Sequence, residues 1–193
     1  MLIANSDTRD ASETTLTGAV AIVTGAAGSG IGAGIADELS RRGVRLVVAD
    51  LDPFGIEEKA RVIHETGGEA IAVAADISDE TARQSLVDTA VDRFGGIDIV
   101  VNSAAAVMPA PLESIDLDTW RKVYSVNVEG ILDLCRKALP HLRESPRAAI
   151  VNIGALGGVH GRENSGAYGS SKAALINLTY QLAMEWGPDG VRV

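Results

Sequence analysis

The sequence predicts an α/β fold in which a doubly wound, mostly parallel sheet carries helices on both faces. Short apolar runs rich in Val, Ile and Ala recur along the chain with little polar alternation, which is typical of strands buried on both faces of a parallel sheet. Between these runs, apolar residues recur at spacings of three and four, so that they share one face of a helix. Strand and helix alternate five times, and this order implies right-handed crossovers.

The individual elements follow from these patterns in chain order. The predicted strands are residues 19–23 (AVAIV), 44–49 (VRLVVA), 70–75 (AIAVAA), 97–101 (IDIVV) and 148–153 (AAIVNI). One helical face follows the first strand, one precedes the fourth, a long one precedes the fifth, and one follows the fifth. In that order, their apolar positions are Ile31, Ile35 and Leu39; Ala82, Leu86, Ala90 and Phe94; Trp120, Tyr124, Asn127, Ile131, Cys135 and Leu139; and Leu175, Leu178 and Leu182.

The two ends of the chain set the expected domain boundaries. Residues 1–17 are polar and acidic, and we expect a flexible N-terminal tail there. Residues 18–193 are expected to form a single domain. The segment Gly187-Pro188-Asp189-Gly190 is a turn signal, and Val191-Arg192-Val193 has the pattern of a sixth strand that has only begun. We therefore expect the natural protein to be longer, with C-terminal strands that this chain lacks.

Composition excludes several classes of function. The chain has 193 residues, of which 46% are hydrophobic and 22% charged, so it is globular rather than disordered. The single cysteine, Cys135, allows no intrachain disulfide, and three scattered histidines give no metal-ligand spacing, so we expect no metal. A net charge of −9 and an aromatic content of 4% argue against nucleic acid and anionic membranes as partners. Because the sequence shows neither a signal peptide nor a membrane span, we expect a cytoplasmic location.

A glycine-rich turn follows the first predicted strand and runs into the first helix. It reads Thr24-Gly25-Ala26-Ala27-Gly28-Ser29-Gly30-Ile31-Gly32. Such a turn lets backbone N–H groups approach a phosphate, and the helix N-terminus adds partial positive charge. It lacks the Gly-Lys-Ser/Thr ending of a P-loop. A flexible turn is the alternative interpretation, but the position between strand and helix, with an acid closing the next strand, favours dinucleotide binding.

Acidic residues close the second and third predicted strands. Asp50 lies 18 residues after Gly32, where a carboxylate accepts hydrogen bonds from the adenosine ribose and repels a 2′-phosphate. We therefore expect NAD to be preferred over NADP; the alternative is that Asp50 is a solvated loop acid. Asp76 either binds an adenine amino group or caps the helix that follows, and the sequence leaves both interpretations open.

These motifs resemble those of the short-chain dehydrogenase/reductase family, over residues 18–193. The family's glycine motif is matched by Thr24, Gly25, Gly30, Ile31 and Gly32, its adenine-pocket acid by Asp76, its fourth-strand Asn by Asn102, its mid-helix Asn by Asn127, and its Tyr-x-x-x-Lys pair by Tyr168 and Lys172. The resemblance implies a Rossmann fold that binds NAD. The implied cofactor contacts are Gly25, Ala27, Ser29, Gly30, Ile31, Gly32, Asp50, Leu51, Asp76, Ile77, Asn102, Ala104, Tyr168 and Lys172. The resemblance also implies a homodimer or homotetramer in which two long helices pair across the interface. An exposed apolar stripe over residues 116–140 would be compatible with such an interface.

The predicted catalytic residues are Tyr168, Lys172 and Asn127. Tyr168 and Lys172 lie four residues apart on a predicted helix and therefore share a face. A nearby ammonium favours phenolate, so we expect Lys172 to lower the pKa of Tyr168 from about 10, toward the range in which a phenol relays a proton near neutral pH. Lys172 can also hold a ribose hydroxyl. The alternative is a Tyr and a Lys on a solvated helix face.

Asn127 interrupts an apolar face and needs a hydrogen-bond partner. The resemblance implies that it joins a water-linked proton relay with the lysine, and the alternative is a satisfied buried amide.

The chain departs from the family pattern at three places. The glycine turn has one extra residue, which a bulge at Gly28-Ser29 would absorb. The fourth-strand motif reads Asn102-Ser103-Ala104-Ala105, so a methyl group replaces a glycine near the cofactor path. Ala155 stands where the family has a catalytic Ser, and an alanine donates no hydrogen bond to a substrate oxygen. Three explanations stay open: another donor such as Ser165, a shifted loop register, or a protein that binds NAD without efficient turnover.

Two functional hypotheses follow. In the first, the protein is an NAD-dependent oxidoreductase that interconverts a small secondary alcohol and a ketone, with Tyr168 as the acid/base. Residues 103–115 and 155–164, which include Ala155 and His160, would then shape the substrate pocket. In the second, the protein is a non-catalytic dinucleotide-binding or scaffold protein on the same fold. The sequence does not predict which alcohol or ketone is the substrate.

Overall fold

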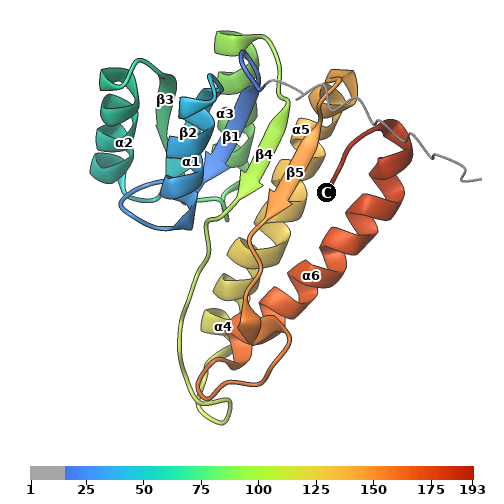
Figure 1. Ribbon diagram of the computed structural model, residues 1–193. Coiled ribbons are helices and arrows are strands. Elements are labelled where there is room, and N and C mark those ends of the chain that lie inside the picture. The colour runs from blue at the N-terminus through green and yellow to red at the C-terminus, as the bar shows by residue number, and fades with distance from the viewer. Residues whose placement is uncertain (1–15) are drawn as a thin grey trace, which may run out of the picture.

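The computed structural model describes residues 16–193, which form one five-stranded sheet flanked by helices (Figure 1). The strand order is β3-β2-β1-β4-β5, and every neighbouring pair is parallel. The strands are β1 (Val20–Thr24), β2 (Arg45–Asp50), β3 (Glu69–Ala74), β4 (Ile99–Asn102) and β5 (Ala149–Asn152). The predicted doubly wound sheet is confirmed, and each predicted apolar run overlaps one observed strand.

Helices cover both faces of this sheet. The first face carries α1 (Ile31–Arg41) and α2 (Pro53–Glu65), and the second carries α3 (Glu80–Phe94), α5 (Ile131–Glu144) and α6 (Gly166–Trp186). Successive strand residues point to opposite faces, so each strand feeds two cores. In β1, Val20 and Ile22 pack on the side of α3 and α5, whereas Ala21 and Val23 pack on the side of α1 and α2. The connection from β2 to β3 lies on the first face, and the connection from β3 to β4 lies on the second. β4 therefore pairs with β1 on the side away from β2, and the strand order reverses between β1 and β4.

The long helical face predicted over residues 120–139 is interrupted. It consists of α4 (Leu117–Tyr124), a π-helical turn (Ser125–Gly130) and then α5. The predicted exposed apolar stripe over 116–140 is not found, because most of this face packs against the sheet and its neighbouring helices; of its large apolar side chains, Leu117 is the exposed one. The π-helical turn buries Asn127 completely and brings Gly130 against the backbone carbonyl of Ile77, where a Cβ would not fit.

The two ends of the described chain lie on the sheet and its core. Leu16 packs against the core on the side of α1 and α2; the rest of the predicted tail, residues 1–15, lies outside the described residues. At the other end, Arg192 pairs in parallel with β5: Ile150 N donates to Arg192 O at 2.8 Å and Arg192 N donates to Ala148 O at 3.2 Å. The end of the chain therefore lies beside β5 (Figure 1), where the sequence predicts a sixth strand. Within residues 16–193, no helix has the length and apolar character needed to cross a membrane.

Candidate functional site

A pocket of about 370 Å³ lies at the carboxyl ends of the strands, beside the point where the strand order reverses. In open α/β sheets this is the place where ligands bind. The lining comes from four connections and from the helix after β4: Gly25 after β1, residues 49–51 after β2, residues 75–77 after β3, residues 103–108 after β4, and Lys122 and Val126. The predicted residues Gly25, Asp50, Leu51, Asp76, Ile77 and Ala104 are among them, and so is Ala105, whose methyl group replaces the family's glycine.

The glycine-rich turn packs tightly at its ends and is open in the middle. Gly25 has φ 68°, and a Cβ there would lie 2.6 Å from the backbone nitrogen of Ala104. Gly32 likewise has no room for a Cβ, because the carbonyl of Gly25 lies against it. Around Gly28 and Gly30, by contrast, nothing lies within 4 Å of the Cβ position. The first N–H groups of α1 have no partner inside the helix, and its N-cap Gly30 has no side chain to cap them. The open turn can therefore accept an anion such as a pyrophosphate.

Ser29 and Ile31 are exposed on this open part of the turn, and Gly28 there has φ 67°. The extra residue of the turn thus falls where the backbone meets no neighbouring side chain. The backbone N–H of Ala27, a predicted cofactor contact, donates to Asp50 Oδ2 at 3.0 Å and so ties the glycine turn to the end of β2.

Asp50 is half-buried at the mouth of the pocket, and both of its oxygens are held by backbone groups. Oδ2 accepts from Ala27, and Oδ1 accepts from the N–H of Asp52 at 3.1 Å. Asp52 is itself the N-cap of α2, with its side chain accepting from Phe54 N. Each Asp50 oxygen keeps a further lone pair, so the carboxylate can still accept hydrogen bonds from a ribose diol.

Asp76 lies across the pocket and is held from two elements. Its Oδ1 accepts from the N–H and Oγ of Ser78 at 2.9 and 2.7 Å, and its Oδ2 lies 2.9 Å from Lys122 Nζ. The hydrogen bond from the Lys122 ammonium, followed by those from Ser78, lowers the pKa of Asp76 to about 2. The N-cap of α3 is Asp79, which accepts from Thr81 N, so the capping interpretation of Asp76 is wrong.

Lys122 is a pocket residue that the sequence reasoning missed. Its Nζ also donates to Ser78 Oγ at 2.7 Å, so that one ammonium holds two side chains of the β3–α3 connection. The sequence carries no signal for it, because Lys122 reads as one more charged residue on the polar side of a predicted helix.

Asn102 points away from the pocket. Its side chain is buried, and Nδ2 donates to Asn152 Oδ1 at 2.8 Å and to Cys135 Sγ at 3.3 Å. Asn152 in turn donates to Thr179 Oγ1 at 2.9 Å. These contacts join β4, β5, α5 and α6 beneath the site. A contact between residue 102 and a ligand in the pocket would therefore come from its backbone.

Asn127 joins the pocket floor to α6. Its Oδ1 accepts from Ala106 N at 2.8 Å, and its Nδ2 donates to Ala106 O and to Ser171 Oγ, both at 3.0 Å. Ser171, which the sequence reasoning did not single out, donates from Oγ to Tyr168 O at 2.7 Å. The side chain of Asn127 is thus a satisfied buried amide. The water-linked connection to Lys172 stays a prediction.

Tyr168 and Lys172 are neighbours on α6, as their spacing predicts. Lys172 Nζ lies 5.9 Å from the centroid of the Tyr168 ring and donates to Ile153 O at 2.7 Å. Only 1% of Lys172 is exposed, so the solvated-face alternative is wrong for this residue. Burial disfavours the charged form and lowers the pKa of Lys172 to about 8. The pair therefore places an ammonium that can lose its proton near neutral pH beside a phenol.

Ala155 and His160 lie on the connection between β5 and α6. Ala155 has an extended backbone (φ −152°, ψ 151°) directly before a short 3₁₀ turn (Leu156–Gly158). His160 and Ser165 line a second cavity of about 380 Å³, and Tyr168 is not among the residues that line it. Residues 103–115 and 155–164 do meet, since Ala110 N donates to Asn164 O at 3.0 Å.

Comparison with known proteins adds independent findings. A family model described as "short chain dehydrogenase" matches residues 19–193. Over 175 residues the chain is 37% identical to cis-4-hydroxycyclohexanecarboxylate dehydrogenase of Sinomonas cyclohexanicum, covering 90% of this chain and 70% of that protein. It is 36% identical to D-threitol dehydrogenase of Mycolicibacterium smegmatis, covering 92% and 68%. A solved structure of 7α-hydroxysteroid dehydrogenase complexed with NADH and 7-oxo glycochenodeoxycholic acid superposes with a TM-score of 0.86 at 30% identity, covering 92% of this chain and 68% of that one.

Proposed function

Since this chain belongs to the short-chain dehydrogenase family, we propose that it interconverts a secondary alcohol and a ketone, with NAD as the hydride carrier. The family and the dehydrogenases among its relatives support an oxidoreductase. The observation that supports this reaction and this cofactor most directly is a continuous series of hydrogen bonds. From Ala106, which lines the pocket, it runs through Asn127 and Ser171 to the backbone carbonyl of Tyr168, whose ring lies beside Lys172.

The residues of the pocket fit an adenine dinucleotide. The open middle of the glycine turn leaves room for a pyrophosphate against the start of α1. Asp50 would accept hydrogen bonds from the ribose hydroxyls, and its charge would repel a 2′-phosphate, so we propose NAD rather than NADP. Leu51 and Ile77 provide apolar surface for the base, and Asp76 provides an acceptor for an exocyclic amino group.

The chemistry of the proposed reaction divides between cofactor and chain. The nicotinamide, when bound, gives or takes the hydride. Tyr168 moves the proton: the phenol gives its proton to the carbonyl oxygen in reduction, which leaves the phenolate, and the phenolate takes the proton from the alcohol in oxidation. Lys172, fixed by the carbonyl of Ile153, stands beside the Tyr168 ring and would present its ammonium to a ribose hydroxyl. Asn127 holds the backbone of Ala106 at the pocket floor.

The test is NADH binding by fluorescence, followed by an oxidation screen on secondary alcohols. Tyr168→Phe removes only the hydroxyl, so NADH binding should be retained while turnover falls by about 10²–10⁴-fold. Asn177→Asp, an exposed position on the same helix, serves as the control and should keep wild-type turnover. Turnover that survives in the Tyr168→Phe variant contradicts the assignment of Tyr168 as the acid/base.

Ala155 favours a second candidate function, a non-catalytic NAD-binding protein, because this position offers no hydroxyl. Ala155→Ser distinguishes the two. If the proposed chemistry operates with one donor missing, the added hydroxyl should raise turnover by roughly 10²-fold. Ala155→Gly, which adds no donor, should not. If wild type and Ala155→Ser both bind NADH and neither turns over any alcohol or ketone in the screen, the non-catalytic function is favoured.

We further propose that the protein forms a homodimer or homotetramer. Along α6, Tyr180 and Met184 lie one turn apart and are 64% and 76% exposed. Large apolar side chains exposed side by side are typical of an association surface. Sedimentation velocity of the wild type and of a Tyr180→Lys/Met184→Lys variant tests this, and a monomeric wild type would contradict it.

A further inference from the structure

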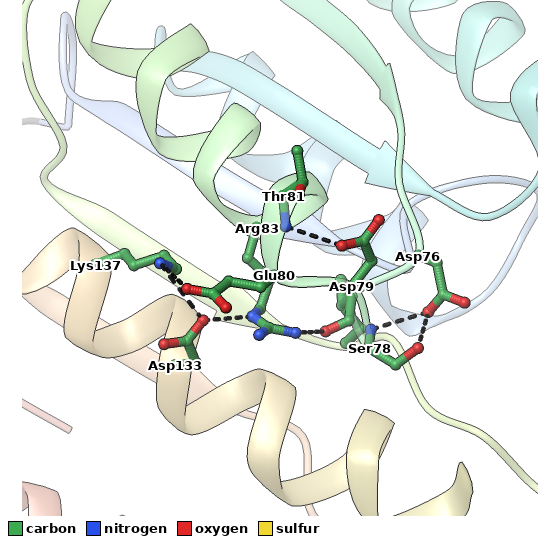
Figure 2. Close-up of polar contacts among 9 residues, drawn as sticks. Asp76, Ser78, Asp79, Glu80, Thr81, Arg83, Asp133 and Lys137 are labelled. Atoms are coloured by element: carbon green, nitrogen blue, oxygen red, sulfur yellow. Dashed lines mark hydrogen bonds and ion pairs between the residues drawn. The ribbon is translucent and has the colours of Figure 1, made fainter.

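An ion pair between a buried arginine and a half-buried aspartate lies behind the wall of the pocket. Arg83 on α3 places its Nε 2.6 Å from Asp133 Oδ2 on α5, as Figure 2 shows. Only 9% of Arg83 is exposed. The same guanidinium also donates from Nη1 to the backbone carbonyl of Ile77 at 2.8 Å. One side chain thus connects a carboxylate on α5 to the main chain of a residue that lines the pocket.

The wall formed by residues 75–77 is held from three directions. Arg83 holds the Ile77 carbonyl from α3, and Gly130, at the end of the π-helical turn, lies against the same oxygen with no room for a Cβ. Lys122 on α4 holds the neighbouring Asp76. The peptide at Ile77 is therefore fixed between α3, the next helix in the chain, and the π-helical turn, which lies far from it in the sequence. It carries Asp76 and the Ile77 side chain with it.

We infer that Arg83 and Asp133 are positioning residues for the adenosine half of the cofactor, an inference that rests on the proposed function. Neither residue lines the pocket. A guanidinium is planar and presents its donors in a fixed geometry, so Asp133 on Nε determines where Nη1 meets the Ile77 carbonyl. Because the bonds are charge-assisted and the guanidinium is almost fully buried, they are stronger than an exposed contact. Loss of the guanidinium leaves the Ile77 carbonyl without this donor and frees the wall to move relative to Asp50.

Because of the neighbouring charges, the substitution Arg83→Met leaves Asp133 with a cationic partner. Lys137 lies 3.8 Å from Asp133 and 3.4 Å from Glu80, so Asp133 keeps a cationic neighbour when Arg83 is removed (Figure 2). The variant therefore leaves no unpaired buried charge, which would otherwise dominate the result. Met fills much of the volume of the lost side chain.

The opposite face of the sheet offers a matched control. Lys59 on α2 pairs with Asp37 on α1 at 2.8 Å. The side chains of Lys59 and Asp37 are 9% and 39% exposed. The corresponding values for the side chains of Arg83 and Asp133 are 11% and 27%. Both pairs link two helices, but neither Lys59 nor Asp37 lines the pocket. Lys59→Met therefore removes a comparable ion pair that has no connection to the pocket wall.

The experiment compares wild type, Arg83→Met and Lys59→Met by calorimetric titration with ADP-ribose and by NADH fluorescence. In Arg83→Met we expect the Kd for both ligands to rise about tenfold, the equivalent of ~1.4 kcal/mol. In Lys59→Met we expect wild-type Kd values even where the Tm falls by a similar amount. Where a substrate is found, the KM for NAD should rise in Arg83→Met while kcat at saturating NAD is retained.

Each outcome is decisive. Equal Kd values in Arg83→Met and Lys59→Met, with wild-type binding intact, overturn the inference alone. A wild type that binds neither NADH nor ADP-ribose contradicts the proposed function and the inference with it. If Arg83→Met does not fold, Arg83→Lys takes its place: a single ammonium cannot reproduce both contacts, so its Kd should also rise, and a wild-type Kd would overturn the inference.

Discussion

The two carboxylates that flank the pocket are rigid for different physical reasons. Asp50 is held by two backbone N–H groups, one from the glycine turn and one from the start of α2. Asp76 is held by side chains, Ser78 from its own loop and Lys122 from α4. Groups held in this way lose little side-chain freedom when a ligand binds, which preserves affinity. Single substitutions here should therefore change cofactor affinity more than folding stability.

Asp50 should determine cofactor preference. Asp50→Ala should weaken NADH binding by about tenfold, because the ribose loses an acceptor, and should strengthen NADPH binding, because the repulsion of the 2′-phosphate is removed. Asp50→Asn is the matched control: it keeps an acceptor and loses the charge, so NADPH binding should improve with a smaller loss for NADH. Fluorescence titration with both nucleotides measures the effect. Unchanged Kd values for both nucleotides in Asp50→Ala would refute the role.

Lys172 should make folding stability depend on pH in an unusual direction. Burial lowers its pKa from 10.5 to about 8 in the folded chain. Between pH 8 and 10.5 the folded state has released a proton that the unfolded state still binds, so this group makes the free energy of unfolding rise with pH. The rise is on the order of 3 kcal/mol if the shift is fully expressed. Below pH 8 Lys172 carries its charge in both the folded and the unfolded state. Burial of that charge then lowers the free energy of unfolding, and the rise with pH does not occur.

Urea unfolding of wild type and Lys172→Met from pH 7 to pH 10 tests this contribution. Wild type should gain stability relative to the variant as the pH rises through 8. The Ile153 carbonyl loses its donor in the variant, but that cost is the same at every pH. Lys137→Met, at a less buried lysine, controls for ordinary lysine titration. Curves for wild type and Lys172→Met that run parallel over this range would show that burial of Lys172 does not shift its pKa in the protein.

The sequence predicted those site residues whose position follows from local pattern. Asp50 and Asp76 each close a strand, and the carboxyl ends of parallel strands meet at one edge, so both were expected to reach the pocket. Lys122 and Arg83 could not be found in this way. Their roles depend on contacts across 46 and 50 residues of sequence, between elements whose relative placement no local pattern gives. The direction of the Asn102 side chain was unpredictable for the same reason.

Among the elements near the pocket, the π-helical turn is one that periodicity failed to predict. Spacings of three and four over residues 120–139 read as one continuous helix, and they tolerate one wider turn without losing the apolar face. The wider turn nevertheless determines where Asn127 and Gly130 lie, and both contact backbone near the pocket. Such turns are frequent at functional sites. The strands were predictable because each coincides with a short apolar run, and the three central strands β1, β2 and β4 are buried on both faces.

Substitutions in the glycine-rich turn between β1 and α1 should distinguish a glycine that is needed for folding from one that is needed for cofactor binding. At Gly30, φ is −74° and the Cβ position is open, so Gly30→Ala should leave the Tm unchanged. The added methyl group would stand where a pyrophosphate approaches, so the Kd for NADH should rise at least tenfold. Gly25→Ala should instead lower stability by several kcal/mol, since φ is positive and the Cβ meets the backbone of Ala104. Thermal unfolding and NADH titration of both variants check the two effects, and equal behaviour of the two would contradict the distinction.

Considered as a whole, the molecule assembles its site from connections that are distant in sequence. The turn after β1, the ends of β2 and β3, the segment after β4 and helix α6 all reach the same edge of the sheet. Topology therefore explains how a cofactor site forms, but it does not specify a substrate. The segments expected to contact one, residues 103–115 and 155–164, are irregular and are tied together at Ala110 and Asn164. Their shape follows from that mutual contact, which the sequence pattern does not encode.

A ligand that contacts all these connections binds only the folded chain, so it should raise the Tm of the whole domain. With NADH at 100 times its Kd, the stabilisation is about 2.7 kcal/mol. For a chain of this size each kcal/mol is worth roughly 2–4 °C, so the Tm should rise by about 5–10 °C. ADP-ribose should produce much of this shift, and nicotinamide mononucleotide little, because Asp50, Asp76 and Ile77, which we propose to hold the adenosine, line the pocket. Differential scanning calorimetry measures the effect without requiring turnover. The oxidoreductase and the non-catalytic binding protein both predict the shift, so a Tm that is independent of NADH into the millimolar range would contradict both.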